Sequence, residues 1–321
     1  MRDTAQERGT DMTAAGETPL VTILMGTRNG APHLREQLDS LARQTQSRWR
    51  LWVGDDGSTD TTRQILTDFA ASVPQEVRLL DGPGKGVAGN FLALLCHPDL
   101  PPGPVAFSDQ DDIWYPHRLA RALDRLSEAG EGVALYCSRT ELGTDPDRPR
   151  ATSPLWQRPP SFRNALIQTV AGGNTMVLSE GGVTLARSAG LDPLPAFHDW
   201  WFYQLVSGSG GKILYDAQPT LFYRQHHHNQ LGRNRGFAAR YARFGTIWQG
   251  RYHHWITRNV RALQRNSHLL TAENQAILAE FAALRRCKGP QVIAGWQRLG
   301  LHRQGRLETA LMAGAAMLGR I

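Results

Sequence analysis

Residues 20–30, LVTILMGTRNG, begin as an apolar, β-branched run and end in polar and glycine residues. Such a run predicts a buried strand that leads into a loop. The next segment, APHLREQLDSLARQT, places Leu34, Leu38 and Leu41 at the spacing of one helix face. A buried strand followed directly by a helix is the repeating unit of α/β sheets.

The alternation of strand and helix continues along the chain. Apolar runs predict strands at 49–53, 77–82 and 104–109, and helical patterns follow the first two at 62–73 and 90–97. This alternation predicts an α/β fold with a Rossmann-like, open and mostly parallel sheet flanked by helices. Ligands of such sheets bind outside the carboxyl ends of the strands, so the loops at those ends are the expected site.

The loops after the second and fourth predicted strands are acidic. They read VGDDGSTD and FSDQDDIW, and aspartates crowd together as Asp55 and Asp56 in the first and as Asp109, Asp111 and Asp112 in the second. Carboxylates this close repel one another unless a positive group lies between them. A hard divalent cation, Mg²⁺ or Mn²⁺, takes carboxylate oxygens as ligands and shares its coordination with substrate phosphates. The alternative for DQDD is a polar turn that caps a helix, and for Asp112 we favour the cap.

The next 100 residues contain fewer clear signals. The proline-rich segment 141–162 predicts a long surface loop. We predict strands within 167–179 (IQTVAGGNTMVLS) and 210–229, and a helix at 196–210 (AFHDWWFYQLVSGSG).

The composition of the 321-residue chain is that of a folded protein, since 41% of its residues are hydrophobic. Its three cysteines, Cys96, Cys137 and Cys287, are far apart, which argues against a disulfide scaffold and fits a reducing compartment. The first residues do not resemble a secretory signal, and no apolar stretch approaches the roughly 18 residues of a membrane span. We expect residues 1–18 to be disordered and the protein to be cytoplasmic.

Positive charge is concentrated in the last part of the chain. Residues 233–321 contain 15 Arg and Lys against three Glu, a net charge of +12, whereas the whole chain carries +7. From residue 237 the pattern changes to Arg-rich helices without strands. Such a region either meets an anionic partner or is a solvated helical surface. We expect 237–321 to present a basic face to anionic membrane lipid or to a lipid-diphosphate acceptor, and a homodimer contact is the other possibility.

Seven segments, in order from Leu20 to Gly232, resemble the inverting family-two glycosyltransferases with the GT-A fold. They are VTILMGTRNG, VGDDGSTDTT, GPGKGVAGNF, FSDQDDIWYPHRL, AGGNTMV, HDWWFYQL and GGKILYDAQPTLFYRQHHHNQLG. HDWW followed by YRQH and NQLG is most similar to the bacterial rhamnosyltransferase-type branch, which builds surface polysaccharides. The resemblance implies a GT-A domain at 19–236, with a nucleotide-binding half at 19–130 and an acceptor half at 131–236, followed by a helical region at 237–321.

The resemblance implies roles for the first two loops. Thr27, Arg28 and Asn29 stand where the family's first loop meets the nucleotide. Arg28 departs from the family pattern, which often has tyrosine there, so its contact with base or ribose is expected to differ. Asp55 and Asp56 match the acidic pair that accepts a hydrogen bond from the pyrimidine ring. Capping of the next helix by the DDGSTD turn is the alternative for that pair.

The glycine-rich loop PGKGVAG predicts a second contact with the nucleotide sugar. Gly84, Gly86 and Gly89 allow the backbone to approach a ligand closely, and Asn90 follows as a polar contact. Lys85, one of three lysines in the chain, is a candidate to offset phosphate charge. An ordinary turn is the alternative.

The resemblance also implies a metal site. Asp109 and Asp111 match the family's Asp-x-Asp signature, in which Asp109 meets the ribose or the metal and Asp111 ligates the cation that bridges both phosphates. His226 matches a histidine on the metal or the diphosphate. The run HHHN is not a three-histidine zinc site, because consecutive side chains of an extended segment alternate between faces. Arg224 is either a diphosphate clamp or part of a structural ion pair.

Asp199 is the predicted general base. It lies beside His198 and three aromatic residues, and a partly apolar pocket raises the pKa of a carboxylate, which makes it a better base. The resemblance assigns the catalytic base to the same position. The alternative is that Asp199 caps the helix that carries Trp200, Trp201 and Tyr203. We expect those aromatics to be core residues rather than sugar-stacking platforms.

The predicted function is metal-dependent transfer of a sugar, with rhamnose favoured, and with inversion. The donor is a nucleotide-diphosphate sugar, dTDP-rhamnose or a UDP-sugar, and the acceptor is a hydroxyl of a glycan or a lipid-linked glycan at the inner face of the membrane. Three alternatives are a nucleotide-sugar-binding protein without turnover, a sugar-1-phosphate nucleotidyltransferase and a nucleic-acid-binding protein. The second needs a basic triphosphate loop that GTRNGAPHL does not provide. The third rests on the basic tail alone, so no nucleic acid is expected.

Overall fold

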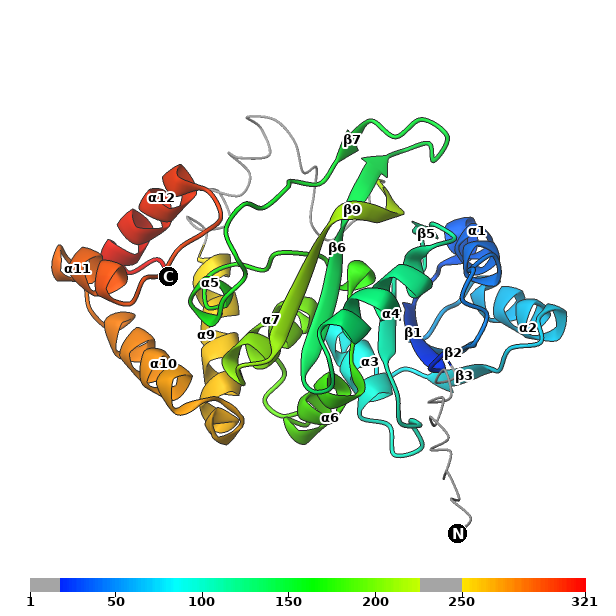
Figure 1. Ribbon diagram of the computed structural model, residues 1–321, viewed down its shortest axis with the longest axis horizontal. Coiled ribbons are helices and arrows are strands. Elements are labelled where there is room, and N and C mark those ends of the chain that lie inside the picture. The colour runs from blue at the N-terminus through cyan, green and yellow to red at the C-terminus, as the bar shows by residue number, and fades with distance from the viewer. Residues whose placement is uncertain (1–17, 226–249) are drawn as a thin grey trace, which may run out of the picture.

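The computed structural model describes residues 18–225 and 250–321 (Figure 1). The segment predicted to be disordered, 1–18, lies outside these residues except for its last position. His226 and the rest of the histidine run lie outside them as well.

A nine-stranded mixed sheet forms the centre of the molecule, in the order β3-β2-β1-β4-β8-β6-β9-β5, with β7 paired to β6. Its first half, β3-β2-β1-β4, is parallel, whereas β8 runs antiparallel to both of its neighbours. The strands are β1 (Val21–Thr27), β2 (Trp49–Asp55), β3 (Val77–Asp81), β4 (Val105–Ser108), β5 (Ile113–Trp114), β6 (Ala134–Gly143), β7 (Ala151–Thr152), β8 (Val177–Leu178) and β9 (Lys212–Arg224). The predicted α/β class and the mostly parallel sheet are confirmed.

Helices cover both faces of this sheet. They are α1 (Ala31–Ala42), α2 (Thr62–Ser72), α3 (Gly86–Leu95), α4 (Arg118–Glu128), α5 (Phe162–Ala165), α6 (Glu180–Ser188), α7 (His198–Gly208), α9 (Arg251–Arg265), α10 (Ala272–Leu284), α11 (Gln291–Arg298) and α12 (Arg306–Met317), with 3₁₀ turns η1 (Gly173–Thr175) and η2 (Ser267–Leu269). Strand alternation divides the core in two, because successive side chains point to opposite faces. On β1, Ile23 and Met25 pack in a cluster with α1, α2 and α4. Leu24 packs on the other face with α3, α6 and α7.

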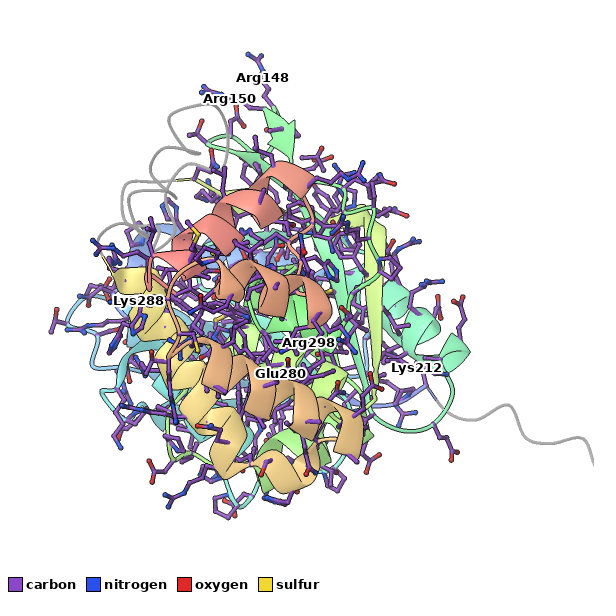
Figure 2. All side chains as sticks on the ribbon, turned by 90° about the vertical axis from the view of Figure 1, so that its left-hand side faces the viewer. Arg148, Arg150, Lys212, Glu280, Lys288 and Arg298 are labelled. Atoms are coloured by element: carbon purple, nitrogen blue, oxygen red, sulfur yellow. The ribbon has the colours of Figure 1, made fainter. Side chains whose placement is uncertain are left out.

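The carboxyl-terminal helices belong to the second of these clusters. Ile256 of α9, Phe281 of α10 and Trp296 of α11 are in the same group of buried side chains as Phe107 of β4 and Leu135 of β6. In Figure 1, α10, α11 and α12 lie at the opposite end of the molecule from α1 and α2. Figure 2 looks onto this end, where Arg298 of α11 donates to Glu280 of α10 at 2.7 Å. The helices therefore extend the core of the sheet.

Two sequence predictions in the middle of the chain were wrong in detail. The segment 167–179 forms only the short strand β8, because the pair Gly172–Gly173 and Asn174 enter the turn η1 instead. The segment 141–162 is not a loop throughout, since β7 adds to the edge of β6 through the pairs Glu141–Thr152 and Leu142–Ala151. The long strand predicted after residue 210 is confirmed as β9, which ends at Arg224.

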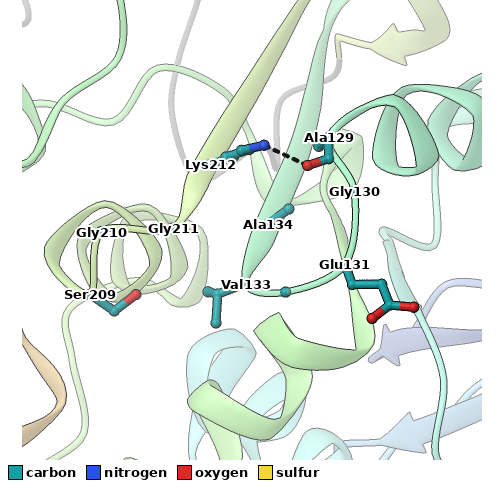
Figure 3. A pocket seen from close by; sticks show the side chains of 10 residues that line it. Ala129, Gly130, Glu131, Val133, Ala134, Ser209, Gly210, Gly211 and Lys212 are labelled. Carbon is teal, nitrogen blue, oxygen red and sulfur yellow. Dashed lines mark hydrogen bonds between the residues drawn. The ribbon is translucent and has the colours of Figure 1, made fainter.

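A shallow hollow of about 230 Å³ lies at the amino ends of β6 and β9 (Figure 3). Its lining comes from the loops 129–134 and 209–212, and Lys212 closes one side by donating from Nζ to the carbonyl of Ala129 at 2.5 Å. The acidic loops lie near the other end of β9, a strand of 13 residues that spans roughly 40 Å. This hollow is therefore separate from the predicted site.

Candidate active site

The carboxyl ends of the parallel strands bring the predicted loops together. Thr27 at the end of β1 is in register with Asp55 at the end of β2, which is in register with Asp81 of β3. On the other side, Met25 of β1 is in register with Ser108, the last residue of β4 before Asp109. The convergence of the loops after β1, β2 and β4 at one edge is confirmed.

Asp55 is a buried support of the β2 loop. Its side chain has an exposed fraction of 0%. Its oxygens accept hydrogen bonds from Thr27 Oγ1 at 3.2 Å, Ser58 Oγ at 2.5 Å and the guanidinium of Arg63 at 3.0 Å. Arg63 also pairs with Asp81 at 2.9 Å. In this arrangement no oxygen of Asp55 faces outward, so the predicted contact with a pyrimidine rests on Asp56.

Asp56 holds the glycine-rich loop in place. Its two carboxylate oxygens accept from the backbone amides of Gly84 at 2.9 Å and Gly86 at 3.1 Å. Both glycines have positive φ angles, +66° and +73°, a conformation that other residues adopt only with strain. The side chain of Asp56 thus joins the β2 loop to the start of α3. Lys85 is the residue between the two glycines whose amides Asp56 binds.

The first loop is fixed by its neighbours on both sides. Asn29, at φ +49°, accepts from the amide of Thr59 at 2.8 Å through Oδ1 and donates its own amide to Ser58. Gln110 accepts from the amide of Arg28 at 2.9 Å and donates to its carbonyl at 3.2 Å. Gln110 was not among the predicted site residues. Its position between Asp109 and Asp111 is the feature of the sequence that could have indicated a place in the site.

Asn90 lies beneath the edge rather than on it. It is 3% exposed, and its Nδ2 donates to the carbonyl of Gly54 at 2.7 Å. A Cβ atom on Gly54 would lie 2.1 Å from Asn90 Oδ1, so glycine at this point of β2 is what makes room for the amide. The amide nitrogen of Asn90 thus supports the backbone of β2, and its contact with a ligand stays a prediction.

The three aspartates of the DQDD loop are in three different environments. Burial, together with the charges of Asp111 and Asp199, raises the pKa of Asp109 to about 7. The backbone carbonyl of Asp111 accepts from Arg224 Nε at 3.3 Å. Asp112 is fully buried and accepts from Asn174 Nδ2 at 2.5 Å. The prediction that Asp112 caps a helix was wrong, because α4 begins six residues later and has no side-chain cap.

Arg224 forms the structural ion pair that was one of its two predicted roles, and its role as a diphosphate clamp stays a prediction. Its guanidinium pairs with Glu36 of α1 at 2.5 Å, which is the structural ion pair. The same guanidinium contacts the backbone of Asp111, so it reaches the acidic loop from the end of β9. Only 9% of the Arg224 side chain is exposed.

Asp199 lies in the first turn of α7. Burial raises its pKa to about 6, and this effect is partly offset by the backbone amide of Trp200, which donates to the carboxylate at 2.7 Å, and by that of Gly173. The helix is capped at Phe197 without a side-chain hydrogen bond, so Asp199 is not its N-cap. Trp200 and Trp201 are 4% and 1% exposed, as expected of core residues. The ring of His198, which precedes Asp199, lies 5.9 Å from that of Phe107, two residues before Asp109, so α7 brings Asp199 close to the DQDD loop.

The sequence of the chain matches the family model described as Glycosyl transferase family 2 over residues 22–188, just over half of its length. The chain belongs to glycosyl transferase family 2. The matched region contains the first two loops and the DQDD loop, whereas Asp199 and Arg224 follow it.

Relatives and solved structures agree with this assignment. The glycosyltransferase is 29% identical over 251 residues to the dTDP-rhamnosyl transferase RfbG of Shigella flexneri, covering 76% of this chain and 86% of that protein. Its fold resembles the mannosyltransferase PcManGT from Pyrobaculum calidifontis in complex with GDP-Man and Mn²⁺, at TM-score 0.52 and 18% identity, covering 94% and 86% of the two chains. It also resembles S. aureus TarS 1-349 in complex with UDP-GlcNAc, at TM-score 0.52 and 15% identity, covering 87% and 90%. The GT-A type of fold is thereby shown.

The acidic residues of the glycosyltransferase fit a hard divalent cation. Asp109 and Asp111 offer carboxylate oxygens, and a cation between them would relieve the repulsion that, after burial, contributes to the raised pKa of Asp109. Within residues 18–225 and 250–321, no three His, Cys, Asp or Glu side chains form a complete metal-binding group. A cation held here would therefore draw further ligands from a diphosphate or from residues such as His226, which lies outside the described part of the chain.

Proposed function

We propose that this family 2 glycosyltransferase moves a sugar, with rhamnose favoured, from a nucleotide-diphosphate donor to a hydroxyl of a glycan or lipid-linked glycan, with inversion. The observation that carries the proposal is the packing of His198, next to Asp199, against Phe107, two residues before Asp109, which brings the predicted base close to the acidic loop. A base on the acceptor side faces a phosphate-binding edge on the donor side, which is what a single displacement requires. The relative named for dTDP-rhamnose transfer is the reason that rhamnose is favoured.

The chemistry follows from the position of Asp199. The oxygen of the acceptor hydroxyl forms a bond to the anomeric carbon while the bond from that carbon to the diphosphate oxygen breaks. Asp199 takes the hydroxyl proton, and the nucleoside diphosphate leaves with the electron pair. A pKa of about 6 leaves the carboxylate ionised at neutral pH yet close enough to that pH to accept a proton efficiently.

On the donor side, the chain supplies binding and positioning. Thr27, Arg28 and Asn29 border the proposed nucleotide site, and Asp56 with the Gly86 amide shapes its glycine-rich wall. Asp109, Asp111 and His226 would hold Mg²⁺ or Mn²⁺, which when bound supplies charge stabilisation for the departing diphosphate. Arg224 adds a fixed positive charge behind the same loop.

The experiment that tests this function is a donor panel with the purified full chain. Binding of dTDP-rhamnose and of UDP-sugars is measured by protection against thermal unfolding, with Mg²⁺, with Mn²⁺ and with chelator, and turnover by nucleotide release. We expect one donor to protect the protein only with metal, and we expect Asp111→Ala to abolish that protection. Asp124→Asn, on the exposed part of α4, is the control for loss of an acidic residue. If no nucleotide sugar protects the wild type under any metal condition, the proposal fails.

We propose further that the region 237–321 binds an anionic membrane surface at the inner face of the membrane. On α12, Leu307 and Leu311 are 59% and 41% exposed and share one helix face, and Leu318, directly after the helix, is 53% exposed. Arg306 begins this helix and Lys288 packs beside Gly319 at its end. The acidic residue of α12, Glu308, is already paired with Arg303. An apolar stripe with cations at both ends suits the interface of an anionic bilayer. No helix in the described part of the chain is long and apolar enough to cross a membrane.

Vesicle flotation tests the membrane proposal. The full chain is expected to float with vesicles that contain an anionic lipid and to remain behind with neutral vesicles. Leu307→Ser combined with Leu311→Ser should reduce flotation without lowering transfer to a soluble acceptor. Dependence on chain concentration rather than on lipid charge would assign the stripe to a homodimer contact and overturn the proposal.

A further inference from the structure

The turn η1 lies between the donor-side acidic loop and the helix that carries the base. It reads Gly173-Asn174-Thr175, and all three residues are buried. Gly173 contacts the start of α7, whereas Asn174 reaches the DQDD loop. Two consecutive residues of one turn therefore touch both halves of the site.

Asn174 fixes the acidic loop through Asp112. Asn174 is 4% exposed, and its Nδ2 donates to Asp112 Oδ2 at 2.5 Å. Asp112 is 0% exposed, and its other oxygen, Oδ1, has no hydrogen-bond partner among the described residues. Within the described residues, the bond from Asn174 is therefore the only hydrogen bond to the side chain of Asp112. Because Asp112 is covalently joined to Asp111, the position of one sets the position of the other.

A buried cation supports the same loop from the opposite side. Arg118 is 0% exposed and its guanidinium lies 4.0 Å from the ring centre of Trp114, two residues after Asp112. It also donates to Thr220 of β9 at 3.2 Å. The loop is thus held between η1 on one side and α4 on the other.

Gly173 fixes the base. A Cβ atom at Gly173 would lie 2.2 Å from His198 Nε2. Any residue other than glycine would therefore clash with the ring of His198 in its present position. That ring packs on Phe91 with centroids 4.3 Å apart, and it immediately precedes Asp199. Burial raises the pKa of Asp199, and the backbone amide of Gly173 partly offsets that effect.

We propose that the turn Gly173–Asn174 is a positioning device that sets the donor carboxylates and the acceptor base at a fixed spacing. Asn174 acts through Asp112 on Asp109 and Asp111, and Gly173 acts on Asp199 through its amide and through His198. Neither residue touches the reacting atoms in this scheme. The inference rests on the proposed function, since it assigns Asp199 and the DQDD loop the roles given above.

The two residues are expected to affect different kinetic constants. Asn174→Ala should weaken metal-dependent binding of the nucleoside diphosphate, with a Kd at least about 10-fold higher, and should raise KM for the donor. Gly173→Ala should lower kcat by about 100-fold, the cost of roughly 1 Å of misplacement, with the Kd of the nucleoside diphosphate unchanged. The measurements are steady-state transfer kinetics and calorimetric titration of the full chain with dTDP or UDP and Mn²⁺.

Two control variants separate positioning from general destabilisation. Asn164 is also 0% exposed, but it donates to the carbonyl of His302 far from the acidic loops. Asn164→Ala should lower the Tm without changing KM, kcat or Kd. Gly314→Ala, where an added methyl group meets nothing within 4 Å, should leave KM, kcat and Kd unchanged. If Asn174→Ala and Gly173→Ala change only the Tm, as Asn164→Ala does, the positioning role is overturned.

Asp112→Asn tests whether Asp112 is a support or a ligand. The new amide keeps an oxygen that accepts from Asn174, so we expect a Kd within about threefold of wild type and an unchanged KM. A loss of metal-dependent binding as complete as that of Asp111→Ala would make Asp112 a metal ligand and would overturn the inference. Either result presupposes that the wild type transfers a sugar and that Asp199→Asn does not. A wild type without transfer would instead contradict the proposed function.

Discussion

Asp199 illustrates how one residue acquires its chemistry from its surroundings. It lies in the first turn of α7 between aromatic side chains, and burial raises its pKa to about 6. The sequence predicted this from the aromatic neighbours alone. The sequence did not predict the role of Asp112. The same residues DQDD occur in polar turns that cap helices, and nothing near them indicates a buried hydrogen bond to Asn174, 62 positions away.

Asp199→Asn is expected to abolish most turnover while leaving the donor site intact. The amide cannot accept the acceptor proton, so kcat should fall by about 10²–10⁴-fold. Metal-dependent protection by the nucleotide sugar should remain within error of wild type. Both are measured on the same preparations, with Asp124→Asn as the matched control. Loss of donor binding in Asp199→Asn would contradict the assignment of Asp199 to the acceptor side.

His198 makes the stability of the protein depend on pH. Burial among Phe91, Phe107 and Phe202 lowers its pKa to about 3, whereas the unfolded chain has a value near 6.5. Between these values the unfolded state binds the additional proton. The stabilisation is therefore present above pH 6.5 and is lost as the pH falls, by up to about 1.4 kcal/mol per pH unit.

Urea unfolding between pH 7.5 and pH 4.5 checks this dependence. His198→Leu should have a smaller loss of unfolding free energy over that range than wild type. His268→Leu, at an exposed histidine, should retain the wild-type slope. Equal slopes for wild type and His198→Leu would show that His198 is not the titrating group.

The glycine-rich loop shows how an element is shaped by a contact from another element. The sequence predicted close approach of its backbone to a ligand from glycine content. The tertiary structure adds the reason for its shape: Asp56, from the β2 loop, accepts from the amides of Gly84 and Gly86. The turn η1 makes the same point, since the apolar pattern of 167–179 predicted a strand and Gly172–Gly173 formed a turn.

Gly86→Ala is expected to destabilise the protein by about 1–2 kcal/mol. The residue has φ +73° and open space around its Cα, so the loss measures backbone strain rather than a clash. Gly314→Ala, inside α12, is the matched change without strain and should stabilise by up to about 1 kcal/mol. Unfolding free energies from urea titration compare the two. A Gly86→Ala protein as stable as Gly314→Ala would contradict the strained conformation.

The whole molecule has a core that runs from the sheet into the last helices. Ile256 of α9 and Leu135 of β6 are both 0% exposed and belong to one cluster of buried side chains. The division into a catalytic domain at 19–236 and a helical region at 237–321, proposed from sequence, therefore marks a change of pattern along the chain. In the folded protein, the two regions share one core of buried side chains.

Ile256→Ala should destabilise the entire protein by about 2–5 kcal/mol, as deletions of buried methyl groups do. Because the core is shared, we expect one cooperative unfolding transition that shifts as a whole, monitored by far-ultraviolet circular dichroism and by tryptophan fluorescence. Leu307→Ala, at an exposed leucine, should change the free energy by less than about 0.5 kcal/mol. Two separated transitions for Ile256→Ala would mean that the carboxyl-terminal helices unfold independently.

The sequence by itself determined the class of the fold and the residues that border the site. Strand and helix periodicity are local properties, and parallel strands bring their carboxyl ends to one edge of the sheet. The sequence alone therefore predicted that Thr27, Asp55 and Asp109 lie at the same edge. Tertiary structure decided which of those side chains face outward. It buried Asp55, Asn90 and Asp112 as supports, and it placed Gly173 and Asn174 between the two halves of the site. Burial and hydrogen bonds between distant segments depend on how the elements pack, which no local pattern records.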